Sequence, residues 1–378
     1  MEVQPDLIRW AKARSGADES ALARRFPKIG AWEQGEASPT LKQLEDFANA
    51  THTPVGYLFL DVPPVESVPI PDYRTLADGG VTGPSADLLD TIFQCQQRQQ
   101  WYRSFAEVNQ EPPVPFIGTL STKTPVAEAA SRMRSELQFD VADRGSTFIQ
   151  ALSRLAHEAE EHGVLVMVNG IVGSNTHRKL DPREFRGFAL VDPLAPLVFV
   201  NGADTKAAQI FTLAHECAHL WLGETALSDA DLAGQPSIDA ERWCNQVAAE
   251  FLIPLVEIVD ALDLGGDLAD QLDRLARRFK VSTLVVLRRI YEANGLTWDE
   301  YRSAYRAELE RVLELLGERA DSGGNFYNTQ PIRVSKRFAR ALISSTLEGQ
   351  TLYTEAFEML GFKKISTFRE LAERLGVG

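Results

Sequence analysis

The sequence predicts an α+β, mostly helical fold in which a small sheet and a central buried helix are flanked by helical modules. Residues 211–222 are apolar nearly all round, which is the pattern of a buried helix, and they contain the motif H-E-x-x-H. Short apolar runs at 164–168, 185–192 and 197–201, bounded by turn residues, predict strands. Apolar positions spaced near 3.6 residues predict helices over much of the remaining chain.

Composition narrows the class of protein. The 378 residues are enough for several domains, and 44% hydrophobic with 24% charged residues is typical of a soluble globular chain. The net charge of −14 argues against a protein that coats nucleic acid with its whole surface, although a local basic face is compatible with it. The three cysteines form no disulfide framework, the N-terminus lacks a secretory signal, and no apolar run approaches a membrane span. We therefore expect a cytoplasmic protein without membrane association.

Residues 1–60 are predicted to form a module of short helices. Apolar residues from Leu7 to Ala11 mark the first helix, 19–26 form the second, and the segment 38–40 caps another that begins at Leu41. The phrases A-L-A-R-R-F, W-E-Q-G-E-A-S-P-T-L and P-V-G-Y-L-F-L resemble an XRE-type helix-turn-helix module, which implies DNA binding.

One interval of this module departs from the XRE pattern. The stretch from Leu22 to Trp32 is about four residues shorter than in that family, which shortens the turn and the recognition helix. Residues 1–60 also carry seven Lys and Arg against eight Asp and Glu. Specific DNA binding and docking to a protein therefore both stay open for this module.

Residues 61–84 are predicted to be a linker. The segment 61–74 carries four prolines in alternation with valine and isoleucine, so it should be extended and semi-rigid. It can act as a spacer alone. The other hypothesis is that residues 65–73 lie along the following domain as an added strand and guard its groove.

Residues 85–265 are predicted to form the central domain. Helices are expected over 85–110, 126–137 and 147–162, followed by the three strands and the buried helix. In that helix His215 and His219 stand one turn apart on one face, so both imidazoles can bind one metal ion. Glu216 is turned about 100° from His215, which places its carboxylate as a general base rather than a ligand.

A catalytic zinc ion needs three protein ligands and one open position. A longer motif with a third histidine is excluded, because Leu222 and Thr225 occupy the positions that it requires. The carboxylates that follow are candidates for the third ligand: Glu224, Asp229, Asp231, Asp239, Glu241 and Glu250. We select Glu241, because it shares one face of a second predicted helix with Asn245 and with small alanines that permit close packing on the first helix. Asn245 is expected to orient a metal ligand by hydrogen bonding.

Two phrases resemble the ImmA/IrrE family of zinc metallopeptidases. They are F-T-L-A-H-E-x-x-H at 211–219 and E-R-W-C-N-Q-V-A-A-E-F-L-I-P at 241–254, and the likeness extends over roughly residues 120–300. The resemblance implies a minimal zincin-like domain with zinc ligands His215, His219 and Glu241 and catalytic Glu216. It also implies cleavage of, or regulatory action on, a helix-turn-helix repressor that is often encoded nearby.

Residues 266–320 are predicted to form a second helix-turn-helix-like module. One helix ends at Leu275-Ala276, residues 280–282 make a turn with Ser282 as N-cap, and 283–290 form the next helix. Its candidate nucleic-acid-binding residues are Arg277, Arg278, Arg288 and Arg289. Nucleic-acid contact and packing against the peptidase domain both stay open.

Residues 321–378 are predicted to form a small strand-and-helix appendage. Longer ImmA/IrrE relatives with such tails resemble components of toxin–antitoxin pairs, which implies a partner-binding role. Two functions therefore remain for the chain. The first is a zinc endopeptidase that cuts a protein partner, and the second is a non-enzymatic antitoxin or transcriptional regulator that binds a toxin or DNA around a structural metal site.

Overall fold

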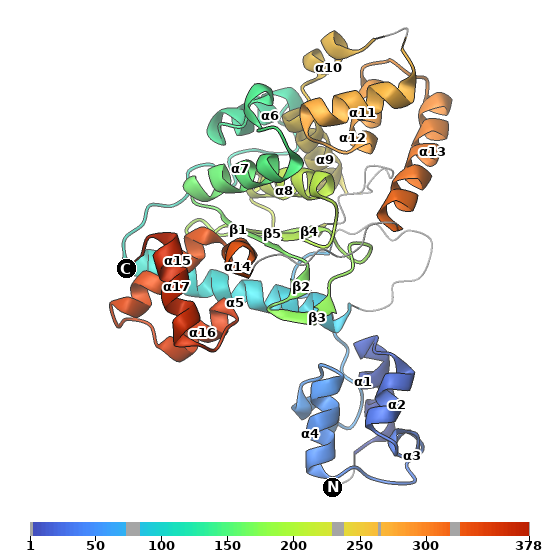
Figure 1. The fold of residues 1–378 in the computed structure, drawn as a ribbon, viewed down its shortest axis with the longest axis vertical. Helices are drawn as coiled ribbons and strands as arrows, with labels where there is room; N and C mark the ends of the chain where they lie inside the picture. The colour runs from blue at the N-terminus through green and yellow to red at the C-terminus, as the bar shows by residue number, and fades with distance from the viewer. Residues whose placement is uncertain (1–2, 73–83, 229–237, 264–265, 318–325, 378) are drawn as a thin grey trace. The chain divides into compact units, whose positions relative to one another are not determined.

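The computed structural model describes residues 3–72, 84–228, 238–263, 266–317 and 326–377. The chain forms two compact units, and Figure 1 labels most of their helices and strands. The first comprises Met1–Pro69 and Asp78–Ile92, and the second Ile70–Ala77 and Phe93–Gly378. The second unit combines a small mixed sheet with many helices, which confirms the predicted α+β, mostly helical class.

The first unit is built from short capped helices. Asp18 accepts hydrogen bonds from the backbone N–H groups of Ser20 and Ala21, and Thr40 forms a capping box with Gln43. The core is apolar and includes edge-to-face aromatic contacts. The six-residue α3 was not predicted, and its short length agrees with the short interval from Leu22 to Trp32. The elements of this unit are α1 (Pro5–Ser15), α2 (Glu19–Arg25), α3 (Ile29–Gln34), α4 (Leu41–Ala50) and the 3-10 helix η1 (Val55–Phe59).

The sheet of the second unit has the order β1-β5-β4-β6. Its strands are β1 (Leu165–Asn169), β4 (Gly187–Leu190), β5 (Leu197–Asn201) and β6 (Ala226–Ser228). β1 and β5 are parallel, whereas β4 runs antiparallel to both β5 and β6. The three predicted strands are confirmed. β6 and β2 (Ile171–Val172) escaped prediction because they are too short to show a period. β3 (Asn175–Lys179), which forms a separate hairpin with β2, escaped it because its residues N-T-H-R-K are all polar.

The two faces of the sheet pack against different helices. Val166 and Val168 of β1 and Val198 and Val200 of β5 belong to the core shared with α7 (Phe148–Glu161) and α8 (Lys206–Leu222). Met167, between the two valines, contacts Cys95 of α5 (Ala86–Val108). Figure 1 shows α7 and α8 on one side of the sheet and α5 on the other. The strands are therefore buried on both faces, which explains their continuous apolar runs.

Helices complete the unit around this sheet. α6 (Val126–Glu136) and α9 (Asp239–Leu252) pack on the side of α8, and α10 (Leu255–Ala261) follows. The predicted turn at 280–282 is confirmed: Ser282 caps α12 (Thr283–Glu292) by accepting from Val285 N, although α11 (Leu268–Phe279) extends three residues beyond its expected end. α13 (Trp298–Gly317) packs on α12.

The C-terminal residues differ from expectation. The predicted strand-and-helix appendage is wrong for residues 326–377, which contain α14 (Phe326–Val334), α15 (Lys336–Leu347), α16 (Tyr353–Leu360) and α17 (Ile365–Leu375) and no strand. The run I-R-V at 332–334 continues a helix despite its β-branched residues, because α14 packs along β1. The first residues of the predicted appendage, 321–325, lie outside the described residues.

The proline-rich segment makes one contact that bears on its role. Asp72 forms a parallel bridge with Leu227 of β6, and Leu227 N donates to Pro71 O at 2.9 Å. The segment therefore adds to the outer edge of the sheet at this point, as the added-strand hypothesis requires. Residues 73–83 of the predicted linker lie outside the described part. Among the described residues, no helix combines the length and hydropathy needed to cross a membrane.

Candidate metal centre

The metal centre is organised on α8. Thr205 caps the helix by accepting from Ala208 N, and Gly223, with φ of 75°, ends it in the left-handed conformation that glycine adopts without strain. All residues from Gln209 to Trp221 are buried. Three polar side chains of the motif are thus carried into the interior, where each needs a compensating partner.

The end of α8 is anchored by the segment that precedes α6. Gly118 N and Leu120 N donate to Leu220 O and Trp221 O at 3.0 and 2.9 Å, so two terminal carbonyls of the helix are satisfied. The Phe116 ring stacks on Trp221 with centroids 3.8 Å apart. This anchoring fixes the helix turn that carries His219.

The two histidines of the motif converge with a third side chain, that of Glu241. The Nε2 atoms of His215 and His219 are 3.1 Å apart. Glu241 Oε2 lies 3.3 Å from His215 Nε2, and its Oε1 lies 3.0 Å from His219 Nε2. Their ligand atoms all fall within 4.8 Å of one another. Two nitrogens and one carboxylate therefore point at a common position.

Glu241 reaches this position from the first turn of α9, which packs closely on α8 through small residues such as Ala248. Ser228, at the end of β6, donates from Oγ to Glu241 Oε1 at 3.1 Å, and its Oγ lies 3.4 Å from His219 Nε2. The sheet edge thus holds the carboxylate that α9 supplies.

Glu216 lies beside the cluster without a hydrogen bond to its carboxylate in the described part of the chain. It faces β4, where a Cβ built on Gly187 would come within 2.6 Å of Thr212 Cγ2 and 3.1 Å of Glu216 Oε1. Only glycine at 187 leaves room for α8 and this carboxylate. The Glu216 side chain is therefore buried, uncompensated and next to the convergent ligands.

The electrostatics of the cluster follow from burial and proximity. Burial, together with the charge of Glu241, raises the pKa of Glu216 well above its usual value. Burial alone would also raise the pKa of Glu241, but its contacts with His215 and His219 outweigh this effect and hold that pKa below its usual value. Burial lowers the pKa of His219 despite its contact with Glu241, which favours the neutral imidazole that binds metals.

These residues fit a metal ion. Neutral imidazoles and a carboxylate form a donor set used for divalent transition metals, and a cation at their focus would compensate the buried charge of Glu241. The same cation would give the orphaned Glu216 carboxylate a water molecule to contact. His215, His219 and Glu241 are the residues that could hold it.

The other sequence candidates lie elsewhere. The Glu250 carboxylate accepts hydrogen bonds from Arg289 and from Leu255 N at the far end of α9, away from the cluster. Asn245 carries a buried Oδ1 with no hydrogen-bond partner among the described residues, and its orienting role stays a prediction. Asp229 and Asp231 lie outside the described residues.

The four arginines of the second module have unlike environments. Arg277 and Arg278 are exposed, with weak or surface ion pairs to Asp273 and Glu257. Arg288 is half-buried against Glu292 and Tyr301. Arg289 is 4% exposed, pairs with Glu250 and Glu292, and donates to Ile253 O at 3.0 Å. The prediction that Arg289 lies on a nucleic-acid-binding face is wrong, because its guanidinium joins α12 to the end of α9.

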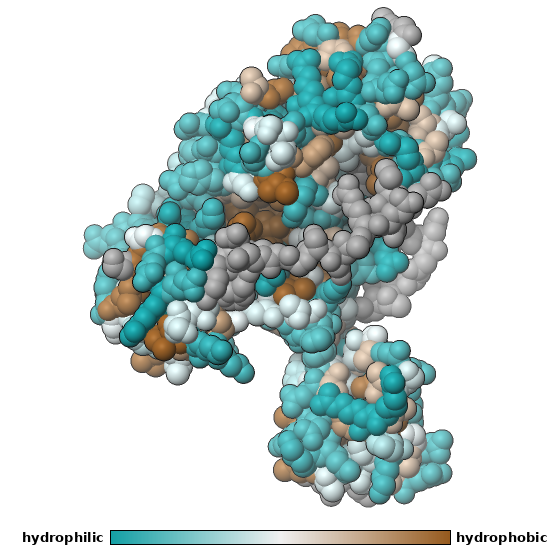
Figure 2. Space-filling model, viewed as in Figure 1, coloured by the Kyte–Doolittle hydropathy of each residue, from teal (hydrophilic) through white to brown (hydrophobic). Residues whose placement is uncertain are grey.

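The surface of this module has a hydrophilic part and a hydrophobic part. In Figure 2 the outer side of α11 is mostly hydrophilic, and brown surface at the top of the view lies over α10, where Val256 and Val259 are exposed. Of the four candidate arginines, Arg277 and Arg278 are thus the exposed ones, and each lies beside an acidic partner.

Two site residues escaped sequence reasoning. Ser228 follows Ala-Leu, which carries no recognisable motif. It reaches the cluster because β6 pairs with β4. Gly187 stands in F-R-G-F, where glycine within an apolar run is the signal of a close approach.

Comparison with protein families agrees with this geometry. Residues 159–291 match the IrrE N-terminal-like domain. This domain, of the peptidase M78 family, spans the sheet, α8, α9 and most of α12, so the match supports a metallopeptidase-type function of the ImmA/IrrE kind. Residues 334–374 match a domain of unknown function (DUF8813), which corresponds to α15–α17. A search of curated proteins finds no match to the chain.

Proposed function

We propose that the chain is a zinc-dependent regulatory endopeptidase that acts on a protein partner, such as a helix-turn-helix repressor. The observation that carries the proposal is the convergence of His215, His219 and Glu241 beside the orphaned Glu216 carboxylate. The match to the IrrE N-terminal-like domain over the same residues supports it. Two imidazoles, one carboxylate and an open fourth position are the ligand set of catalytic zinc.

The chain's residues have separate roles in this chemistry. A bound zinc ion would polarise the scissile carbonyl and ease deprotonation of the attacking water. Glu216 takes a proton from that water at a carboxylate oxygen and passes it to the leaving amine. Ser228 holds Glu241 in its orientation through the bond to Oε1. Gly187 keeps β4 clear of the Glu216 carboxylate.

The proposal is tested by co-expressing the chain with the products of adjacent genes. Wild type should shorten one neighbour, and Glu216→Gln should cut it at least about 100-fold more slowly while binding the same amount of zinc. Glu224→Gln, which changes a carboxylate outside the cluster, is the matched control and should retain activity. Equal cleavage by wild type and Glu216→Gln would contradict the proposal.

A second function is favoured by one observation. His215, Glu216 and His219 are fully buried, and Glu241 is 3% exposed, which suits a metal that only stabilises the fold. In that case the chain is a non-enzymatic antitoxin or transcriptional regulator, and its helical modules bind a toxin or DNA. Equal neutralisation of a neighbouring toxin by wild type and Glu216→Gln, with no cleavage, would identify this function.

A further inference from the structure

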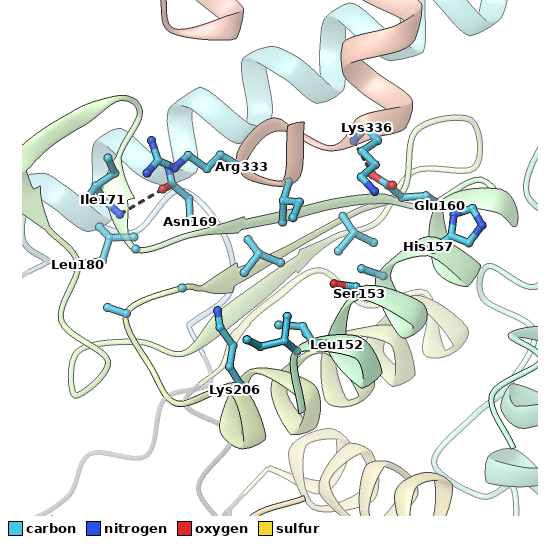
Figure 3. A pocket seen from close by; sticks show the side chains of 18 of the residues that line it. Leu152, Ser153, His157, Glu160, Asn169, Ile171, Leu180, Lys206, Arg333 and Lys336 are labelled. Carbon is cyan, nitrogen blue, oxygen red and sulfur yellow. Dashed lines mark hydrogen bonds between the residues drawn. The ribbon is translucent and has the colours of Figure 1, made fainter. Parts of the chain in front are cut away.

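A second site lies at the opposite end of α8 from the metal centre. It is a pocket of about 590 Å³ at the edge of the sheet formed by β1, shown in Figure 3. Its walls come from α7, from the loops that follow β1 and β5, from the first turn of α8, and from Ile332, Arg333 and Lys336 of the C-terminal helices. A volume of this size holds a small organic molecule.

The position in the sheet favours ligand binding. β1 and β5 are parallel neighbours, and the loops after their carboxyl ends contribute Gly170 and Gly202 to the pocket. A Cβ on either glycine would approach the backbone of the other loop to 2.8 Å, so the two loops meet without side chains. In open sheets the carboxyl ends of parallel strands are where ligands lie.

Two cations of the pocket have no acid to compensate them among the described residues. Lys179, Lys206, Arg333 and Lys336 line it, and Glu160 is its carboxylate. Glu160 is already engaged with Ser335 Oγ at 2.6 Å and Lys336 N at 2.7 Å, and Lys336 is the cation beside it. Lys206 and Arg333 remain without a carboxylate within ion-pair distance among the described residues.

Lys206 is placed unfavourably for a cation. It stands at the first position of α8, where the helix dipole is positive, and its one hydrogen bond to a side chain is to the neutral Gln209 Oε1, at 3.0 Å. Burial lowers the pKa of Lys206, and burial likewise lowers that of Arg333, with no acid to oppose the shift. In Figure 3, Lys206 rises from α8 on one side of the strands and Arg333 lies on the other. An anion in the pocket would relieve the unfavourable charge of both.

The remaining lining residues indicate the chemistry of the part of the ligand that carries no charge. Leu152, Ala156, Val166, Val168 and Ile332 form an apolar floor between the cationic walls. Such a surface suits a ring or chain attached to the anion. Two uncompensated cations suit a multiply charged group such as a phosphate.

We propose that this pocket binds a small molecule of about nucleotide size that carries phosphate groups, which contact Lys206 and Arg333, and an organic part, which lies on the apolar floor. Because α14 and α15 supply one wall and α7, the sheet and α8 supply the others, the bound molecule joins the C-terminal helices to the rest of the unit. The inference does not depend on peptidase activity.

Thermal unfolding and calorimetric titration of the full-length chain test the proposal. ADP and inorganic pyrophosphate should raise the Tm, and adenosine should bind at least tenfold more weakly than ADP. Lys206→Gln and Arg333→Gln should each weaken ADP binding at least tenfold, whereas Lys206→Arg should largely retain it. Arg183→Gln, which removes an exposed arginine paired with Asp181, is the matched control and should bind as wild type.

The Tm of the Lys206→Gln variant without ligand is a second test of the proposal. Without ligand the substitution should leave the Tm unchanged or raise it, because it removes a positive charge from the first turn of α8, where the helix dipole is also positive. A residue with a merely structural role would show the opposite sign. The proposal is overturned if neither ADP nor pyrophosphate shifts the Tm, or if their binding survives in both Lys206→Gln and Arg333→Gln.

Discussion

At the scale of single residues, the metal centre depends on side chains that the H-E-x-x-H motif does not contain. Ser228 connects β6 to Glu241, and Gly187 permits the approach of α8 to β4. Neither residue has chemistry of its own in the proposed reaction. Both act by fixing where a carboxylate stands, and a shift of that position would change the affinity for metal or the geometry of proton transfer.

Replacing Ser228 by alanine tests this role. The Ser228→Ala variant should bind zinc about 10- to 100-fold more weakly, because Glu241 loses the hydrogen bond that orients it. Competition with a chromophoric chelator measures the affinity. Ser104→Ala, on the exposed side of α5, should bind zinc as wild type does. Equal affinity in all three proteins would show that Ser228 does not position the ligand.

At the scale of elements, a buried arginine joins helix ends. Arg144, in the turn before α7, donates to Leu252 O at 2.6 Å and Phe279 O at 2.9 Å, which are the last carbonyls of α9 and α11. Its guanidinium also lies 4.7 Å from the centre of the Phe139 ring. A cation at two helix C-termini is electrostatically favourable and satisfies carbonyls that have no partner within their own helices.

Arg144→Met should therefore lower the free energy of unfolding by about 2–4 kcal/mol, because it leaves these buried carbonyls without donors. Arg132→Met, which removes an exposed arginine of α6, should change it by less than about 0.5 kcal/mol. Denaturant unfolding monitored by circular dichroism compares them. A loss equal in both variants would contradict the capping role of Arg144.

The bridge between Asp72 and β6 bears on access to the metal centre. Ile70, two residues before Asp72, is buried, so replacing it with aspartate should release this segment from the sheet edge. The Ile70→Asp variant should then be cut faster by an added protease within residues 61–72 and should cleave its partner faster. Val65→Asp, which changes a fully exposed residue of the same segment, serves as control. Unchanged protease sensitivity and unchanged activity would leave the segment as a spacer only.

At the scale of the whole molecule, metal binding and unfolding are coupled in one unit. Among the described residues, the His215, His219 and Glu241 cluster belongs to the second unit, so a bound metal stabilises that unit alone. A metal present at 1,000 times its Kd contributes about 4 kcal/mol. Adding a chelator should lower the Tm of the second unit by several degrees and leave that of the first unchanged. Calorimetry of the full chain with and without chelator measures both transitions, and an equal shift of the two would contradict independent units.

The sequence by itself determined which residues form the metal cluster and most elements of the fold. The spacing of His215 and His219 requires only helical geometry, and Glu241 follows from the face that it shares with small residues, so local rules were sufficient. The long helices and the three apolar strands have periods that a single sequence shows directly. Their positions therefore needed no knowledge of the tertiary contacts.

Only the tertiary structure decided the features that depend on contacts between distant segments. Ser228 joins the centre because β6 pairs with β4. Arg289 is buried because it pairs with Glu250 of another helix. Residues 332–334 are helical because α14 packs along β1. The pocket around Lys206 and Arg333 brings together residues more than 100 positions apart. Periodicity and spacing act over a few turns or strands, whereas burial and the pairing of charges are set by the whole fold. Burial and charge pairing decide which polar residues are free to function.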